Sequence, residues 1–182
     1  MRPEHSAEAP VPERRPVAAV IGGASVDAAV EAAAEQLGTA LVDRGFRIVS
    51  GGRGGVMAAV SRGAHRSPGY TEGTVVGILP TVDASEANPW VDVVIPSGLG
   101  HARNVLVVAT GDVVVAVGGS AGTLSEMALA WSHGKPVVAL DIGHGWSARL
   151  AGQSLDDRRS DVVHRATSPQ EAAERARELV AP

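Results

Sequence analysis

Three glycine-rich segments carry most of the chemistry that this sequence offers. Each follows a run of apolar residues and opens an Ala-rich or Leu-containing stretch, which predicts a turn from a strand into a helix. They are Gly22-Gly23-Ala24-Ser25, Ser50-Gly51-Gly52-Arg53-Gly54-Gly55 and Gly118-Gly119-Ser120-Ala121-Gly122-Thr123. Glycine lets a ligand approach the backbone amides, and helix amino termini attract anions. Together the turns predict a phosphate or nucleotide site, although each alone is equally explained as a tight turn packed on a sheet.

Two charged residues beside these turns are candidates for a functional role. Arg103, in Gly100-His101-Ala102-Arg103-Asn104, precedes an apolar run and would lie near the amino end of a helix. A guanidinium there suits bidentate phosphate binding, and a surface salt bridge is the alternative. Glu126 follows Thr123 by three residues, on about the first turn of the next helix. It either points toward the ligand or only stabilises the helix dipole.

The turns and these side chains together define the predicted ligand-binding set. Its members are Gly22, Gly23, Ser25, Gly51, Gly52, Arg53, Gly54, Arg103, Asn104, Gly118, Gly119, Ser120, Ala121, Gly122, Thr123 and Glu126. None of the turns contains the Gly-Lys-Ser/Thr of a Walker A loop, and none is a well-formed GxGxxG dinucleotide fingerprint.

Scarce residue types exclude other chemistry. The chain has no cysteine, which rules out disulfides, thiolate metal sites and cysteine nucleophiles. Its six histidines show no metal-ligand spacing, so no metal site is predicted. No serine lies in a GxSxG elbow, which argues against a serine hydrolase. The single lysine, Lys135, is the only candidate for a Schiff base with pyridoxal phosphate, and it lies just before a strand-starting proline.

Length and composition bound the class of protein. At 182 residues the chain has the length of one domain, and it is rich in Ala (30), Val (27) and Gly (22). A net charge of −4 and 3% aromatic residues argue against a nucleic-acid partner. No apolar run is long enough to span a membrane, and the amino terminus lacks the apolar core of a signal peptide. A cytoplasmic location is therefore expected.

The elements that must position the turns alternate between strand and helix. Continuous apolar runs predict strands buried on both faces at Val17–Ile21, Phe46–Val49, Thr74–Leu79, Val91–Ile95, Asp112–Val117 and Pro136–Leu140. Helices are predicted at Val26–Arg44, Gly55–Arg66, Leu99–Thr110 and Thr123–His133. This alternation predicts an α/β fold, a Rossmann-like doubly wound parallel sheet in three α/β/α layers. The three turns would then meet at the carboxyl edge of the sheet, where such folds bind ligands.

The two ends of the chain are expected to differ. Residues 1–15 hold three prolines and six charged residues and are predicted to be a disordered leader to a single domain at 16–182. Near the other end, Asp161–His164 is expected to be an edge strand. A last helix would be capped by Ser168, with Pro169 at its first position.

Two internal segments are left open. Residues 141–160 are not assigned, and the turn-rich loop Pro80–Trp90 either covers the ligand or is a plain surface connection.

In its glycine turns and in the segments that contain Arg103 and Glu126, the sequence resembles the LOG (Lonely Guy) family and its Rossmann-like relatives. The resemblance covers about Val17–Leu140. The family pattern GGGxxGLM is matched by residues 50–57, with Ser50 in place of the first glycine. The pattern PGGxGTxxE is matched by residues 117–126, with Val117 in place of proline and one extra residue before Gly122. The pattern MHxRK is matched by residues 100–104 without its methionine and lysine.

The resemblance implies a homodimer or higher homo-oligomer that binds a nucleoside 5′-monophosphate. In LOG enzymes the arginine and glutamate of these motifs support hydrolysis of the N-glycosidic bond, releasing base and ribose 5-phosphate. By motif position they correspond to Arg103 and Glu126, and a carboxylate there would stabilise the positive charge that develops on the ribose. The sequence is thus a candidate phosphoribohydrolase, whereas its lone Lys135 disfavours the lysine-decarboxylase label that this superfamily often carries.

The departures from the LOG motifs make the sequence more similar to a second branch of the superfamily. That branch includes the molybdenum-cofactor carrier proteins, which bind a phosphorylated pterin without transforming it. The sequence therefore favours a binding or carrier protein for a phosphorylated, nucleotide-like ligand, with molybdenum cofactor or a nucleoside monophosphate as the candidate ligands. The phosphoribohydrolase is the alternative, and no cofactor is required in either case.

Overall fold

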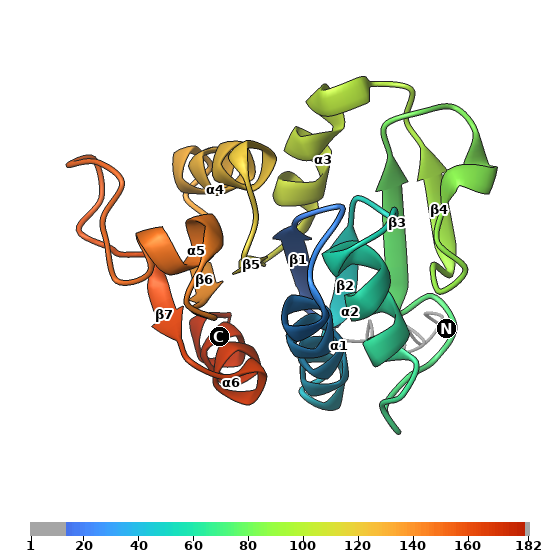
Figure 1. The fold of residues 1–182 in the computed structure, drawn as a ribbon, viewed down its shortest axis with the longest axis horizontal. Helices are drawn as coiled ribbons and strands as arrows, with labels where there is room; N and C mark the ends of the chain where they lie inside the picture. The colour runs from blue at the N-terminus through green and yellow to red at the C-terminus, as the bar shows by residue number, and fades with distance from the viewer. Residues whose placement is uncertain (1–13, 181–182) are drawn as a thin grey trace, which may run out of the picture.

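Seven parallel strands form one sheet in the computed structural model, which describes residues 14–180 (Figure 1). The strands are β1 (Val17–Gly22), β2 (Arg47–Ser50), β3 (Val75–Leu79), β4 (Val93–Pro96), β5 (Val113–Val117), β6 (Val137–Leu140) and β7 (His164–Ala166). Their order is β4-β3-β2-β1-β5-β6-β7, so the chain winds outward from β1 in one direction and then from β5 in the other. The topological switch point lies between β1 and β5. The predicted Rossmann-like doubly wound sheet is confirmed.

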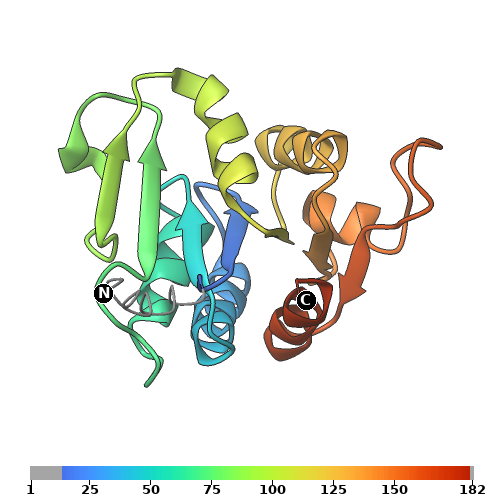
Figure 2. The ribbon, with the colours of Figure 1, turned by 180° about the vertical axis from the view of Figure 1, so that it is seen from behind.

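Helices cover both faces of the sheet, as the two ribbon views show (Figures 1 and 2). The α-helices are α1 (Ala28–Asp43), α2 (Val56–Ala64), α3 (Arg103–Thr110), α4 (Ala121–Ser132), α5 (Gly145–Leu150) and α6 (Pro169–Leu179). Short 3-10 turns η1 (Ala84–Glu86) and η2 (Gly100–Ala102) interrupt the connections around β4. One buried cluster joins the sheet to α1, α2 and α6, and a second joins its other face to α3 and α4.

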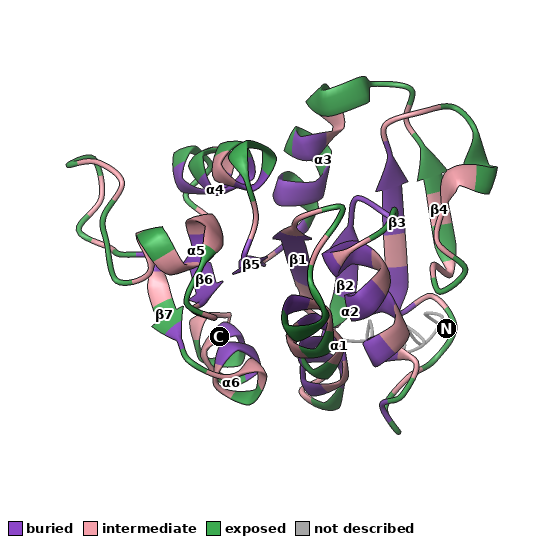
Figure 3. Ribbon diagram, in the orientation of Figure 1, coloured by how far each residue is buried: buried purple, intermediate pink, exposed green. Residues whose placement is uncertain are grey.

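The core explains the valine and alanine content. All five residues of β5 are buried, as expected for a central parallel strand covered on both faces, and buried residues fill the middle of the sheet in Figure 3. Trp131 of α4 is only 3% exposed. Its indole Nε1 donates a hydrogen bond to Asp156 (2.9 Å). Trp131 is therefore a core residue of α4.

Helices α1 and α2 touch through their backbones. Gly38 of α1 lies against the carbonyl of Val60, and Gly63 of α2 lies against the carbonyl of Glu35, so a methyl group at either glycine would overlap the other helix. The Thr39 hydroxyl bridges the helices by donating to the Gly63 carbonyl (2.7 Å). The two helices consequently pack as one unit.

Several element boundaries differ from the predicted ones. The last strand lies at His164–Ala166, so the prediction of Asp161–His164 was wrong by two to three residues. The last helix begins as predicted, with Ser168 as its cap and Pro169 as its first residue. The Ser168 hydroxyl accepts from the backbone N–H of Glu171 (3.2 Å), and the Glu171 carboxylate accepts in return from the N–H of Thr167 (2.8 Å), one residue before the cap. The unassigned stretch 141–160 contains α5.

The predicted leader lies mostly outside the described residues, because the description starts at residue 14. Arg15 is held in place, since its guanidinium donates to the carbonyls of Gly45 (3.1 Å) and Phe46 (3.0 Å). None of the helices within residues 14–180 combines the length and apolar character that crossing a membrane requires.

Candidate functional site

Two adjoining pockets form a cleft at the carboxyl edge of the sheet, beside the switch point. The inner pocket (about 270 Å³) is lined by β1, the first two glycine turns and the amino ends of α3 and α4. The outer pocket (about 600 Å³) shares Ala24, Met57, His101 and Arg103 with it, and extends to Pro80 and Thr81. The two helices that supply Arg103 and Glu126 to the cleft, α3 and α4, lie side by side in both ribbon views (Figures 1 and 2).

Most of the predicted ligand-binding residues line this cleft. They are Gly22, Gly23, Gly51, Arg53, Gly54, Arg103, Asn104, Ser120, Gly122, Thr123 and Glu126. The remaining predicted residues line neither pocket: Ser25, Gly52, Gly118, Gly119 and Ala121. The structure thus brings residues from all three glycine turns together, but not every residue of each turn.

Arg103 is the first residue of α3 and reaches into the cleft. Its side chain is 12% exposed, and its guanidinium lies against Gly51, where any side chain larger than hydrogen would overlap it. The buried Nε has no hydrogen-bond partner among the described residues. Burial lowers the pKa of Arg103; nearby Glu126 opposes this shift, and the charge of Arg53 adds to it. The largely buried guanidinium of Arg103 therefore lacks part of the hydrogen bonding that stabilises a charged group away from water.

Glu126 is buried next to this arginine. Its Oε1 lies 3.9 Å from Nη1 of Arg103, too far for a hydrogen bond, and its side chain is 9% exposed. Burial raises the pKa of Glu126 to about 7, although Arg103 acts in the opposite direction. The carboxyl group can therefore exchange a proton near neutral pH, which is the property needed for general acid or base chemistry.

The helix that carries Glu126 begins earlier than predicted. Ser120 is its N-cap and α4 starts at Ala121, so the predicted start at Thr123 was wrong by two residues. Gly122 suggested a loop, yet it lies in the first helical turn, where backbone N–H groups have no partners within the helix. Glu126 consequently lies in the second turn of α4, and the free N–H groups of the first turn border the cleft.

Sequence reasoning missed the residue that holds the third glycine turn. Ser147 of α5 is fully buried, accepts from the N–H of Gly118 (2.8 Å) and donates to the carbonyl of Leu140 (2.8 Å). The N–H of Trp146 donates to the carbonyl of Gly119 (3.1 Å). Backbone groups of Gly118 and Gly119 are thereby engaged within the protein, and the part of this segment that lines the cleft is the first turn of α4.

A second missed residue, Asn88, holds the second glycine turn. Its side-chain amide donates to the carbonyls of Gly52 (3.1 Å) and Arg53 (3.0 Å), and its backbone N–H also donates to Gly52 (2.8 Å). Arg53 forms an ion pair with Glu86 of η1 (3.1 Å). The loop 80–92 thus fixes this turn and contributes a wall of the outer pocket. Only the turn-rich composition of this loop marked it in the sequence.

The cleft contains few further titratable groups. His101 lines both pockets and is exposed. Within residues 14–180, no three His, Asp or Glu side chains gather in a way that could hold a metal ion. The cleft therefore combines one largely buried cation, one buried carboxyl group and helix amino termini, a set of groups that could accept an anionic ligand.

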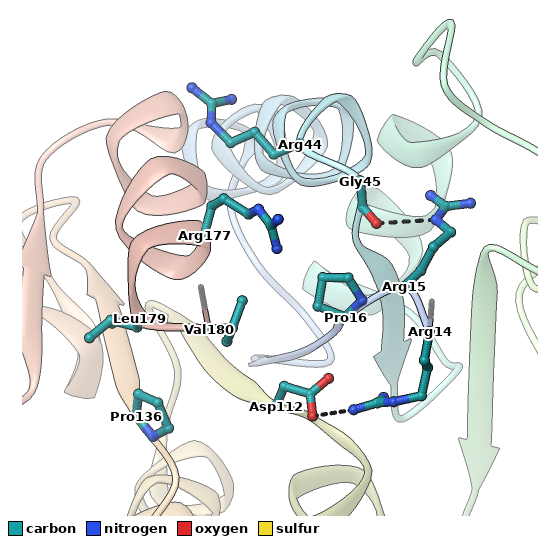
Figure 4. Close-up of a pocket in the computed structure, with 10 residues that line it drawn as sticks. All are labelled: Arg14, Arg15, Pro16, Arg44, Gly45, Asp112, Pro136, Arg177, Leu179 and Val180. Carbon is teal, nitrogen blue, oxygen red and sulfur yellow. Dashed lines mark hydrogen bonds and ion pairs between the residues drawn. The ribbon is translucent and has the colours of Figure 1, made fainter. Parts of the chain in front are cut away.

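A second arginine-lined pocket, of about 550 Å³, opens at the opposite edge of the sheet (Figure 4). Arg14 pairs there with Asp112 (2.8 Å), Arg15 binds backbone carbonyls, and Arg44 donates to the carbonyl of Ala40 (3.1 Å). Helices α1 and α6 both end at this pocket, and helix carboxyl ends favour cations. We call it the amino-edge pocket. Three of its four arginines are bound by groups of the fold and the fourth, Arg177, is exposed to solvent, so this pocket is not the better candidate for an anion site.

Comparison with known proteins agrees with this arrangement. The chain belongs to the SLOG cluster4 family, whose model matches residues 15–173. It is 34% identical to the molybdenum cofactor binding protein from Rippkaea orientalis, with a TM-score of 0.79 over 92% of this chain and 99% of that one. It is 33% identical to the molybdenum cofactor carrier protein from Chlamydomonas reinhardtii, with a TM-score of 0.78 over 92% and 100% of the two chains.

A LOG protein is also similar. The chain is 35% identical over 132 residues to "Probable cytokinin riboside 5′-monophosphate phosphoribohydrolase LOGL5" of Oryza sativa subsp. japonica. The match covers 68% of this chain and spans about half (52%) of the rice protein. The resemblance to a LOG-like, Rossmann-like family close to the molybdenum-cofactor carrier branch is confirmed.

Proposed function

We propose that this protein binds a phosphorylated, nucleotide-like small molecule in the cleft and that molybdenum cofactor is its ligand. The observation that carries the proposal is the guanidinium of Arg103, which is buried, has an unpartnered Nε and lies beside the free N–H groups of α4. A phosphate group between them would accept charge-assisted hydrogen bonds from both sides. The solved relatives whose names include molybdenum cofactor support the choice of ligand because they match nearly the whole chain.

The two pockets suit the two ends of such a ligand. The inner pocket contains Arg103 and the first turn of α4, so it would receive the phosphate. The outer pocket is more than twice as large and would receive the ring system. Thr81 lines this pocket, and its Oγ1 is a buried hydroxyl without a hydrogen-bond partner among residues 14–180. A ring nitrogen or exocyclic group would satisfy it.

Binding measurements with matched arginine variants test the proposal. Purified protein is titrated with molybdenum cofactor and with AMP, and bound cofactor is then recovered and analysed. Arg103→Leu should weaken binding roughly 10- to 100-fold, because hydrogen bonds to a charged group contribute about 1.5–3 kcal/mol. Arg177→Leu, in the amino-edge pocket, is the control and should leave binding unchanged. Equal losses in both variants, or no binding of either ligand at micromolar concentrations, would overturn the proposal.

A phosphoribohydrolase is the second candidate function, and the raised pKa of Glu126 favours it. In that reaction water adds to the anomeric carbon as the N-glycosidic bond breaks, and the base leaves with the bonding electrons and gains a proton. Glu126 could transfer that proton near neutral pH. The assay follows free base released from AMP and cytokinin riboside monophosphates. Release that disappears in Glu126→Gln supports the enzyme, and no release from a broad panel of nucleotides excludes it.

A single domain at 16–182, a cytoplasmic location, a homo-oligomeric state and the lack of a nucleic-acid partner stay predictions for this chain. So does the expectation that ligand binding needs no bound metal from the protein itself.

A further inference from the structure

A cluster of aromatic and charged side chains lies outside the cleft, where the loop 80–92 leads into β4. His65, which follows α2, stacks on Tyr70 with 4.0 Å between the ring centroids and meets the edge of Trp90 at 5.5 Å. Asp92 completes the cluster, and its side chain is only 7% exposed. None of these four residues lines either pocket of the cleft. We call them the His65 cluster.

The geometry of the His65 cluster places a hydrogen on one nitrogen of the His65 ring. Nε2 lies 3.0 Å from the carbonyl oxygen of Trp90 and 3.4 Å from Oδ1 of Asp92. Burial and the hydrogen bond to Asp92 raise the pKa of Tyr70 to about 12, so the phenol keeps its proton at neutral pH and donates it to Asp92. Both oxygens near Nε2 are thus acceptors. Nε2 therefore carries a hydrogen and donates it to Trp90.

The backbone of Trp90 connects His65 to Asn88. The carbonyl of Trp90 accepts from His65, and its N–H donates to Oδ1 of Asn88 (3.1 Å). The two ends of a side-chain amide have nearly the same shape, so hydrogen bonds decide which end points where. Because Oδ1 of Asn88 is bound to Trp90, Nδ2 faces the carbonyls of Gly52 and Arg53 and donates to both. His65 is thereby linked by successive hydrogen bonds to the second glycine turn.

Helix α2 joins the same two points through the covalent chain. It begins directly after the second glycine turn, and His65 follows its last residue. Its nine residues span about 14 Å. The hydrogen bonds through Trp90 and Asn88 lead back from the far end of the helix to the turn. The helix, the end of the loop 80–92 and the turn therefore form a closed circuit that holds the turn from two sides.

The position of the second glycine turn determines the space that Arg103 can occupy. The guanidinium of Arg103 lies against Gly51, where an added Cβ would come within 2.2 Å of Nη1. Gly52 has a φ of +70°, and an added Cβ there would lie 3.1 Å from Cα of Gly77. Binding groups generally have to be held within about 0.5 Å of the productive geometry. A small shift of the turn would therefore change the place of the guanidinium that the ligand needs.

We propose that His65 is a positioning residue for the ligand site. Through Trp90 and Asn88, its Nε2–H holds the second glycine turn where Arg103 requires it, and His65 itself does not touch the ligand. The hydrogen bond carries this effect, and the stacking of the ring does not. The inference rests on the proposed function, because the turn affects binding only if the ligand occupies the cleft.

Two substitutions separate the hydrogen bond of His65 from its ring. His65→Phe keeps a ring that can stack on Tyr70 but has no donor, whereas His65→Gln has a donor nitrogen the same number of bonds from Cα and no ring. In titrations with molybdenum cofactor and AMP, His65→Phe should weaken binding about 2- to 10-fold, as expected for one hydrogen bond, and His65→Gln should bind nearly as well as wild type. His65→Leu, which also lacks a donor, replaces His65→Phe if that variant does not fold.

Ser67→Ala is the control for a general loss of stability in this region. It removes a hydrogen bond to Asp43, which has no part in the circuit, so ligand binding should stay at the wild-type level. Wild-type affinity in His65→Phe, or a loss as large in His65→Gln or Ser67→Ala as in His65→Phe, would overturn the proposal.

A double-mutant cycle tests the route through Asn88. Asn88→Ala should weaken binding by itself, and adding His65→Phe to it should then have little further effect, because the connection to the turn is already broken. Losses that add in full would show that His65 acts by another route, and the proposal would fail.

Amide exchange in the ligand-free protein gives a readout that needs no ligand. Residues 51–55 should exchange about 2- to 10-fold faster in His65→Phe than in wild-type protein, and at the wild-type rate in His65→Gln and Ser67→Ala. Unchanged exchange in His65→Phe would overturn the positioning role of His65. Faster exchange together with a wild-type protein that binds neither ligand would instead count against the proposed function alone.

Discussion

Arginines line a pocket at both edges of the sheet, and the partners of those arginines differ. At the carboxyl edge, Arg103 lies near helix amino termini, its Nε has no partner among the described residues and Glu126 is not within hydrogen-bond distance. At the amino edge, Arg14 has a carboxylate partner and Arg15 and Arg44 have carbonyl partners at or near helix ends. The amino-edge pocket is larger than the inner pocket of the cleft. Arginine content therefore does not identify the binding site; the cleft differs in that its unpartnered guanidinium Nε is buried, whereas the amino-edge arginines are paired or, like Arg177, exposed to solvent.

A carboxyl group in each region differs in the same way: Asp112 at the amino edge has hydrogen-bond donors that lower its pKa, whereas the pKa of Glu126 in the cleft is raised. Burial raises the pKa of Glu126, and a cation 3.9 Å away does not compensate for it. Burial also acts to raise the pKa of Asp112, but hydrogen bonds from Arg14 and from the N–H of Val17, together with the charges of Arg14 and Lys135, outweigh it, and the pKa is lowered. A carboxyl group with a lowered pKa stabilises the fold, and one with a raised pKa destabilises it when charged.

The largest expected effect concerns Glu126→Gln. This variant should lose a pH dependence of folding stability that the wild-type protein shows. Since the native pKa (about 7) lies above the usual 4.5, the native state binds more protons than the unfolded state between these values. Wild-type stability should therefore fall by about 3 kcal/mol as pH rises from 4.5 to 7, and Glu126→Gln should lack this fall. Urea denaturation across this pH range measures it. Parallel pH profiles of the two proteins would contradict the assignment.

A pair of glycine variants comes next. Gly51→Ala should weaken binding of a phosphorylated ligand about 10-fold or more, because the added methyl group displaces the guanidinium of Arg103. Gly45→Ala, beside the amino-edge pocket, should leave binding intact and cost about 1–2 kcal/mol of stability, since Gly45 has a φ of +84° with open space around it. Titration calorimetry and thermal melts separate the two effects. The comparison fails if Gly45→Ala weakens binding as much as Gly51→Ala.

A smaller effect is expected for Asp112→Asn. Because the native pKa of Asp112 is lowered, its charged form stabilises the fold above the unfolded value of 3.8, and this stabilisation is lost as pH falls through the native pKa. Asp112→Asn should cost about 1 kcal/mol at neutral pH and progressively less below pH 3.8. Denaturation at pH 7 and pH 3 checks the trend, which is opposite in sign to that of Glu126. A cost that grows toward acid pH would refute it.

The smallest effect is expected for Arg44→Ala at the carboxyl end of α1. Arg44 donates to a carbonyl of the last helical turn, and such contacts contribute about 0.3–1 kcal/mol. Stability should fall by that amount in low salt and by less in high salt, and ligand binding should not change. A loss of binding here would give the amino-edge pocket a functional role and remove the distinction between the two regions.

Local patterns predicted the fold well. Apolar runs such as Val113–Val117 mark buried parallel strands, and glycine turns after such runs mark the carboxyl edge, so the position of the cleft follows from the sequence pattern alone. Ser168 and Pro169 predicted the start of α6 for the same reason, since capping depends on adjacent residues. Glycine in the first turn of α4 misled the prediction, because Gly122 is tolerated where the helix has no N–H bonds to lose.

Contacts between distant residues could not be predicted in this way. Ser147 reaches Gly118 across 29 residues, and Asn88 reaches Gly52 across 36. Neither side chain belongs to a spacing pattern, and both depend on how α5 and the loop 80–92 fold back over the sheet. The burial that shifts the pKa of Glu126 likewise arises only when α3 and α4 come together. The sequence pattern likewise did not show that the Nε of Arg103 would be buried without a partner.

The backbone contact between α1 and α2 affects how the cleft would respond to a ligand. Helix α2 starts directly after the second glycine turn of the cleft and α1 starts shortly after the first, and Gly38 and Gly63 leave no space for one helix to slide past the other. The first two glycine turns are consequently attached to one rigid unit, the packed pair of α1 and α2. The conformational entropy of these turns is therefore lost during folding, before any ligand binds. A ligand would not have to order them, so more of its interaction energy would appear as affinity. Slow amide exchange in both helices, equal with and without ligand, would be the signature of such a preorganised cleft.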